Sequence, residues 1–71
     1  MYNTHYIIKD EANNNYYTGD NMNSQLITEE HFDDSIYNAM LLDSEEEALG
    51  YIQQTHMMSY LVILQVYSSL N

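Results

Sequence analysis

Carboxylates are the most numerous ionisable groups of this sequence, and most of them fall in two blocks. Eleven Asp and Glu side chains stand against one Lys or Arg, Lys9, so the formal net charge at pH 7 is −10. The blocks comprise Glu29, Glu30, Asp33 and Asp34, then Asp43, Glu45, Glu46 and Glu47. Paired carboxylates perform acid–base catalysis only in a pocket that separates their pKa values. A chain of 71 residues has little room for such a pocket, so the acidic blocks favour binding over catalysis.

Other catalytic signatures do not occur in the sequence. There is no Gly-rich phosphate loop, no GxSxG motif and no cysteine. Neither Ser44 nor Ser59 has neighbours in the sequence that mark an activated hydroxyl. We therefore expect a protein that is not an enzyme.

The acidic blocks have two interpretations. Acidic side chains favour the positive end of a helix dipole, which accounts for the first two carboxylates of each block. This does not account for Asp33 and Asp34, which on one helix would repel the earlier glutamates at spacings of three and four residues. We therefore predict that both blocks together present a negative stripe, a mimic of DNA, to a groove that normally holds phosphates.

Three histidines offer a different chemistry, which is a metal site. On a helix, His31 and Asp34 lie one turn apart and can hold one cation from one face. His5 or His56 would then complete a zinc site, and a metal would suit a small chain without cysteine. The spacing matches no named zinc motif, so surface histidines without a ligand are the alternative interpretation.

Eight tyrosines add contact area to the acidic surface. Tyrosine is enriched at interfaces because its ring is large, rigid and loses little entropy when it is ordered. We assign Tyr6, Tyr51 and Tyr60 to the edge of the core. The expected contacts with a partner are Tyr16, Tyr17 and Tyr37.

An N-terminal β-hairpin and a first short helix are expected to position these side chains. Residues 6–9 and 16–18 have the aromatic and β-branched content of strands, and the asparagine-rich segment between them favours a turn. Thr28 and two following glutamates indicate a helix start. Phe32, Ile36 and Met40 then recur every four residues, which places them on one face of that helix.

A second short helix and a C-terminal strand follow. Ser44 and Glu47 match a capping box, so the helix should cover residues 45–54, although Gly50 weakens it by about 1 kcal/mol relative to alanine. Residues 60–67 form the clearest strand, since both of its faces are apolar. The sequence therefore predicts an α+β fold, with residues 1–71 as one small layered domain.

The last strand also indicates self-association. A strand with two apolar faces is either central and covered on both sides or an edge that pairs with another copy. Two short helices can cover only one face. We therefore predict a homodimer with Leu61, Ile63 and Tyr67 at its interface.

Targeting signals and membrane segments are not expected from the sequence. The N-terminus has no basic region followed by an apolar run, and the longest apolar run, residues 60–64, is far shorter than the roughly 20 residues that a spanning helix needs. A net charge of −10 also repels nucleic acid and anionic membranes. These features favour a cytoplasmic location and a partner that is itself a protein.

The order of several short motifs resembles a loose pattern in small phage and prophage proteins of low-GC bacteria. The motifs are Tyr6-Ile7-Ile8-Lys9, Tyr16-Tyr17-Thr18-Gly19, Ala39, Asp43-Ser44-Glu45-Glu46-Glu47-Ala48 and Tyr51-Ile52. The shared positions are structural and bring no catalytic residue with them. The heavier acidity and the long apolar tail depart from the pattern. The resemblance implies an accessory protein of the anti-CRISPR and host-defence inhibitor class.

Charge and resemblance together suggest an inhibitor. Such a protein would bind the basic surface of a host nucleic-acid-binding protein, for instance a type II CRISPR nuclease, in the host cytoplasm and keep DNA out. The alternative from another class is a structural or regulatory homo-oligomer whose acidity serves only solubility.

Overall fold

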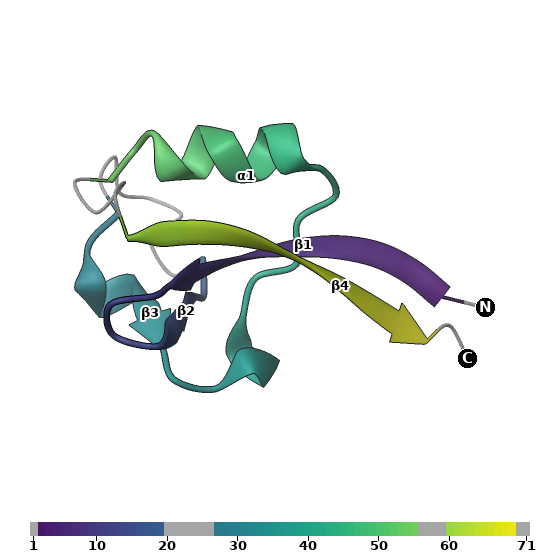
Figure 1. Ribbon diagram of the computed structural model, residues 1–71, viewed down its shortest axis with the longest axis horizontal. Coiled ribbons are helices and arrows are strands. Elements are labelled where there is room, and N and C mark those ends of the chain that lie inside the picture. Colours follow the sequence, from purple (N-terminus) through teal and green to yellow (C-terminus); the bar gives the residue numbers. More distant parts are fainter. Residues whose placement is uncertain (1, 20–26, 56–59, 70–71) are drawn as a thin grey trace.

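The computed structural model of this protein describes residues 2–19, 27–55 and 60–69. Four antiparallel strands form one sheet in the order β3-β2-β1-β4, and one α-helix lies across it (Figure 1). The strands are β1 (Tyr2–Asp10), β2 (Asn15–Tyr17), β3 (Phe32–Asp33) and β4 (Leu61–Ser69). The helical elements are α1 (Glu45–Ile52) and the 3₁₀ turns η1 (Glu29–His31) and η2 (Ile36–Asn38). The predicted α+β class is confirmed.

The N-terminal hairpin is closed by a buried carboxylate. Asp10 is fully buried, and its side chain accepts hydrogen bonds from the Ala12 backbone N–H at 2.9 Å and from Asn13 Nδ2 at 2.8 Å. Asn14 adopts a left-handed φ of 56°, a conformation that asparagine tolerates better than most residues. The asparagine-rich segment therefore folds as the predicted turn between β1 and β2.

The first and last strands form the longest ladder of the sheet. β1 and β4 pair over nine residues, from Tyr2 opposite Ser69 to Asp10 opposite Leu61. β1 is consequently central, with β2 and the isolated bridge from Tyr6 to Leu42 on its other side. The predicted C-terminal strand is confirmed, and it is an edge strand.

Helix α1 begins where the sequence predicts. The Ser44 side chain accepts a hydrogen bond from the Glu47 backbone N–H at 3.1 Å, which caps the helix. Ala48 and Ile52 form its buried side, with exposed fractions of 0% and 8%. Packing of these two residues holds the helix despite Gly50, which is exposed in open space. No helix in the described ranges has the length and apolar content to cross a membrane.

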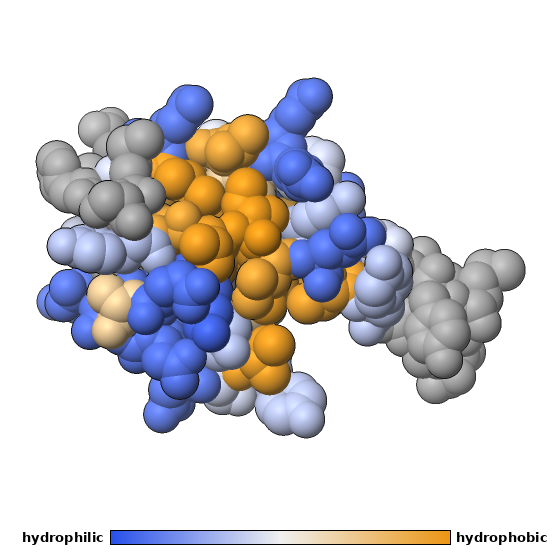
Figure 2. Space-filling view, viewed as in Figure 1, coloured by the Kyte–Doolittle hydropathy of each residue, from blue (hydrophilic) through white to orange (hydrophobic). Residues whose placement is uncertain are grey.

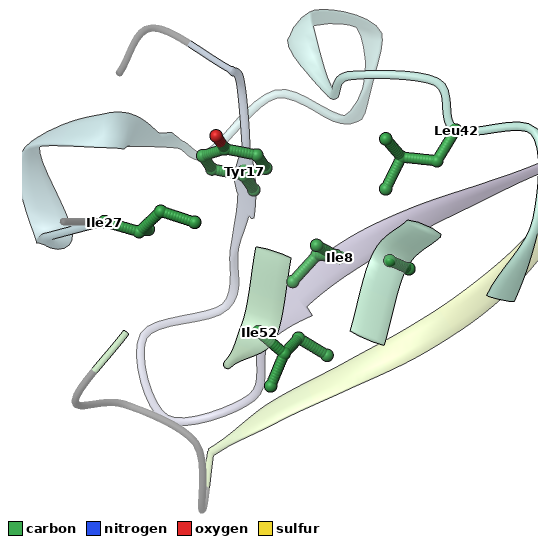
Figure 3. Close-up of a cluster of buried hydrophobic side chains, with 6 residues drawn as sticks. Ile8, Tyr17, Ile27, Leu42 and Ile52 are labelled. Atoms are coloured by element: carbon green, nitrogen blue, oxygen red, sulfur yellow. The ribbon is translucent and has the colours of Figure 1, made fainter. Parts of the chain in front are cut away.

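The core lies between α1, β1 and β2 (Figure 3). Its buried residues are Ile8, Tyr17, Ile27, Leu42, Ala48 and Ile52. Tyr17 is 1% exposed, and its ring centroid lies 5.7 Å from that of Phe32 and 5.5 Å from that of Tyr51. The assignment of Tyr17 to a partner contact was therefore wrong, since this ring is inside the core.

The first predicted helix does not form. The segment is divided into η1, the two residues of β3 and η2. Phe32 pairs with Tyr17 in the sheet, and the Asp33 side chain accepts the Ser35 backbone N–H at 2.9 Å. Such a local bond competes with helical hydrogen bonds, and a short isolated helix is marginal in water. The four-residue apolar spacing was therefore misleading.

The two faces of β4 differ from the prediction. Leu61 and Ile63 are half-buried and pack against the core, because the register places Ile63 opposite Ile8 on the face that α1 covers. Val62 and Leu64 therefore lie on the other face of the sheet. Leu61 and Ile63 are not the free face that the sequence suggested, whereas Tyr67 is 67% exposed.

Two tyrosines that the sequence placed in one class should respond in opposite ways to substitution. Tyr17→Ala removes a buried ring and should lower the free energy of unfolding by about 3–5 kcal/mol. Tyr37→Ala changes a side chain that is 95% exposed and should shift it by less than about 0.5 kcal/mol. Urea unfolding followed by circular dichroism measures both. Equal effects of the two substitutions would contradict the core described above.

Candidate functional site

An open hollow beside β3 combines residues from four segments. Thr18, Glu30, Phe32, Asp33 and Asn38 line a volume of about 370 Å³. They come from the residue that follows β2, from η1, from β3 and from η2. The Thr18 backbone N–H and hydroxyl both donate to the His31 carbonyl at 2.9 Å, which ties η1 to β2. We call this feature the acidic hollow.

Asp33 carries a well-supported negative charge in the acidic hollow. Its Oδ2 accepts hydrogen bonds from Asn38 Nδ2 and from the Ser35 backbone N–H, both at 2.9 Å. The Asn38 side chain first and the Ser35 backbone second hold the pKa of Asp33 below its ordinary value, against a small opposing effect of desolvation. Hydrogen-bond donors stabilise the ionised carboxylate, so Asp33 stays charged under mildly acidic conditions.

The only Lys or Arg of the chain does not neutralise the acidic hollow. Lys9 Nζ lies 3.4 Å from Glu11 Oε2, and it also lies 5.9 Å from the centroid of the Tyr16 ring. Glu30 and Asp33 therefore face solvent without an intramolecular Lys or Arg partner. A Lys or Arg side chain at this site must come from another molecule.

The lining of the hollow suits a basic side chain. Two carboxylates can accept hydrogen bonds from a guanidinium or ammonium group, and such charge-assisted bonds are stronger than neutral ones. Phe32 also lines the hollow, while its half-buried ring packs against the Tyr17 ring. The Thr18 hydroxyl and the Asn38 amide carry further oxygen acceptors. The geometry therefore fits an arginine or lysine side chain.

The second acidic block does not belong to this site. Asp43, Glu45, Glu46 and Glu47 are all exposed at the start of α1. Figure 1 shows the start of α1 well separated from the η1–β3 segment, and Figure 2 shows a hydrophobic area between two hydrophilic areas. The continuous negative stripe was therefore wrong, because β3 interrupts the helix that was to carry its first half. The glutamates of the second block lie in the first turn of α1, where negative charge interacts favourably with the helix dipole.

The two remaining tyrosine candidates lie in different places. Tyr16 is half-buried in β2, opposite Lys9 and Asp33 in the sheet. Tyr37 is 95% exposed in η2, directly before Asn38 of the acidic hollow. Tyr37 is thus the more accessible of these two tyrosines.

The predicted metal site finds little support in the described residues. The extended backbone of β3 separates His31 from Asp34, so they do not share one face of a helix turn. His31 Nδ1 accepts the Thr28 backbone N–H at 3.0 Å, while His5 lies in β1. No three His, Asp or Glu side chains are grouped around a metal position in the described part of the chain. His56 lies outside that part, so zinc binding there stays a prediction.

No family model, curated protein or solved structure matches this chain. Sequence reasoning identified Glu30 and Asp33 but missed Thr18, Phe32 and Asn38. Asp33 followed by Ser35 is a spacing typical of an Asx turn, and this signal would have indicated a break in the helix.

The charge of Asp33 should depend on Asn38. Removal of the side-chain donor in Asn38→Ala should move the pKa of Asp33 upward toward its ordinary value, because the ionised form loses its strongest hydrogen-bond donor. Since the folded-state pKa is lowered, the stabilisation from this group exists above the unfolded-state pKa and is lost as pH falls through the folded-state value.

Carboxyl chemical shifts recorded by NMR during an acid titration measure this pKa. Tyr37→Ala is the matched control, because it changes the neighbouring exposed side chain and leaves the Asn38 amide in place. An unchanged pKa of Asp33 in Asn38→Ala would contradict the assigned hydrogen bond.

Proposed function

We propose that this protein is a non-catalytic binding domain that inserts its acidic charge into the basic surface of a nucleic-acid-handling protein and so competes with nucleic acid. The observation that carries the proposal is the acidic hollow. Its carboxylates, Glu30 and Asp33, have no Lys or Arg partner within the chain, and the pKa of Asp33 is held low. The hollow receives an arginine or lysine side chain of the partner.

The charge of the whole chain supports a basic partner. A net charge of −10 raises the rate at which a positively charged surface is encountered, and it repels nucleic acid. At the point of contact, one ion pair at 4 Å is worth about 1 kcal/mol in water and about 4 kcal/mol near a protein surface. The acidic hollow supplies the local contact, and the net charge supplies the long-range attraction.

The resemblance to small phage proteins supports a specific partner class. RNA-guided nucleases of the type II CRISPR kind hold nucleic acid in positively charged channels. An acidic domain bound in such a channel would exclude DNA without any chemical step. The protein would then act as a phage-type inhibitor in the cytoplasm of the host cell. If the protein binds no such partner in the following experiments, its acidity serves solubility alone.

Removal of the two charges of the acidic hollow should weaken binding to a type II nuclease. The variant Glu30→Gln with Asp33→Asn should raise the dissociation constant about 10-fold or more, since each charge-assisted hydrogen bond contributes about 1.5–3 kcal/mol. Glu45→Gln with Glu46→Gln removes the same charge from α1 and should change it by about 3-fold or less. Competition between the protein and labelled DNA for the nuclease measures both constants.

Each outcome has a clear meaning. Equal weakening by the two double variants would assign binding to the net charge and would remove the hollow from the proposal. No binding of the natural chain to any basic nucleic-acid-binding surface would reject the inhibitor and leave solubility as the use of the charge.

The association rate should fall as salt is added. Above about 0.15 M ionic strength the Debye length is below about 8 Å, so long-range attraction between the acidic domain and a basic partner is screened. Stopped-flow mixing at several salt concentrations measures the rate. A rate that is insensitive to salt would show that the charge does not steer the encounter.

A further inference from the structure

The outer edge of β4 carries backbone groups that turn away from the sheet. Tyr6 exchanges both of its backbone hydrogen bonds with Leu42, at 2.8 Å each, so its groups point away from β4. In an antiparallel ladder, paired and unpaired positions alternate along the strand. Gln65, which lies opposite Tyr6, is therefore a position whose backbone groups point outward.

A second hydrogen bond confirms this alternation. The Glu11 backbone N–H donates to the Tyr60 carbonyl at 2.9 Å, so Tyr60 and every second residue after it turn toward β1. The inward positions are Val62, Leu64 and Val66. The outward positions are Leu61, Ile63, Gln65 and Tyr67. In the described ranges β4 pairs with β1 alone, so the outward groups have no strand partner there.

This edge is free of charge in an otherwise acidic molecule. Residues 60–69 contain no Asp, Glu, Lys or Arg, although the chain as a whole has a net charge of −10. Tyr60, directly before β4, and Tyr67, in its second half, are 54% and 67% exposed. In the same view, the hydrophobic surface of Figure 2 covers the first part of β4 and extends to α1. An exposed strand edge without charge is a template for another strand.

We propose that a second copy of this chain pairs with the outer edge of β4, antiparallel and about a two-fold axis at Leu64. This register places Leu61 opposite Tyr67 and Ile63 opposite Gln65, so all four outward positions find hydrogen-bonding partners. On the other face, Val62 lies opposite Val66 and Leu64 lies opposite its own copy. Each apolar side chain of that face then meets another one.

Electrostatics selects this edge for self-association. Two copies of charge −10 repel each other, and contact is least opposed where neither surface bears carboxylates. In the strand order β3-β2-β1-β4, the acidic hollow lies at the opposite edge of the sheet from β4. Pairing through β4 would place the two β3 strands about 34 Å apart at a spacing of about 4.8 Å per strand, several Debye lengths at physiological salt. The dimer would leave both acidic hollows open.

Hydrogen exchange on the natural chain tests the pairing directly. The amides of Val62, Leu64 and Val66 should be protected at every protein concentration. Those of Leu61, Ile63, Gln65 and Tyr67 should become protected only as the concentration rises, in parallel with a doubling of the 8.4 kDa mass in sedimentation equilibrium. A monomer at the highest concentration measured, or a dimer in which the outward amides exchange rapidly, would overturn the proposal.

Proline substitution provides a matched pair of variants. Gln65→Pro removes an outward N–H and should abolish the dimer while the circular dichroism of the monomer is retained, because proline is tolerated at an open edge. Leu64→Pro removes an inward N–H and should disrupt the β1–β4 ladder itself. A dimer that persists in Gln65→Pro contradicts the proposed edge. If that variant does not fold, the exchange pattern of the natural chain decides.

The same exchange measurement separates a second copy from another occupant. Outward amides that stay unprotected in the pure protein, but become protected when a basic nucleic-acid-binding protein is added, would assign the edge to that protein and overturn the dimer.

Discussion

The ladder between β1 and β4 is the interaction on which the rest of the structure depends. It joins the two ends of the chain over nine residue pairs and makes β1 the central strand. Ile7 and Ile8 then point to opposite faces, and they are 1% and 2% exposed. Closing so long a loop costs conformational entropy, which the burial of both faces of β1 helps to offset. Ile8, on the side of α1, anchors the core, and the hairpin holds β2 in place for β3 to pair with it.

The site exists because β3 interrupts what would otherwise be an acidic helix. Phe32 pairs with Tyr17 in the sheet, and their rings are in contact. The chain is therefore extended over the two residues of β3. The next residues fold back, so that Asn38 of η2 reaches Asp33 of β3. A helix would have spread the carboxylates along a solvated face. The strand and the two 3₁₀ turns instead place Glu30 and Asp33 on the lining of one hollow.

Charge and hydrogen bonding make the two edges of the sheet different. One edge, at β3, carries the acidic hollow, and the other, at β4, carries neutral side chains and outward backbone groups. A basic partner is attracted to the first edge and gains nothing electrostatic from the second. Another neutral strand can pair along β4. The strand β3 is only two residues long, so it offers too short a ladder for such pairing. The two proposed interactions can therefore operate at the same time on one molecule.

The sequence by itself determined the elements that are governed by local chemistry. Capping at Ser44, the turn after Asp10 and the apolar run of β4 each depend on neighbours in the chain, and each was predicted near its observed place. Only the tertiary structure decided the pairing of β1 with β4, the burial of Tyr17 and the loss of the helix after Thr28. These features depend on residues far apart in the sequence, where long-range packing overrides local propensity. Glu30 and Asp33 were visible as charges, but the fold brought them together with Asn38.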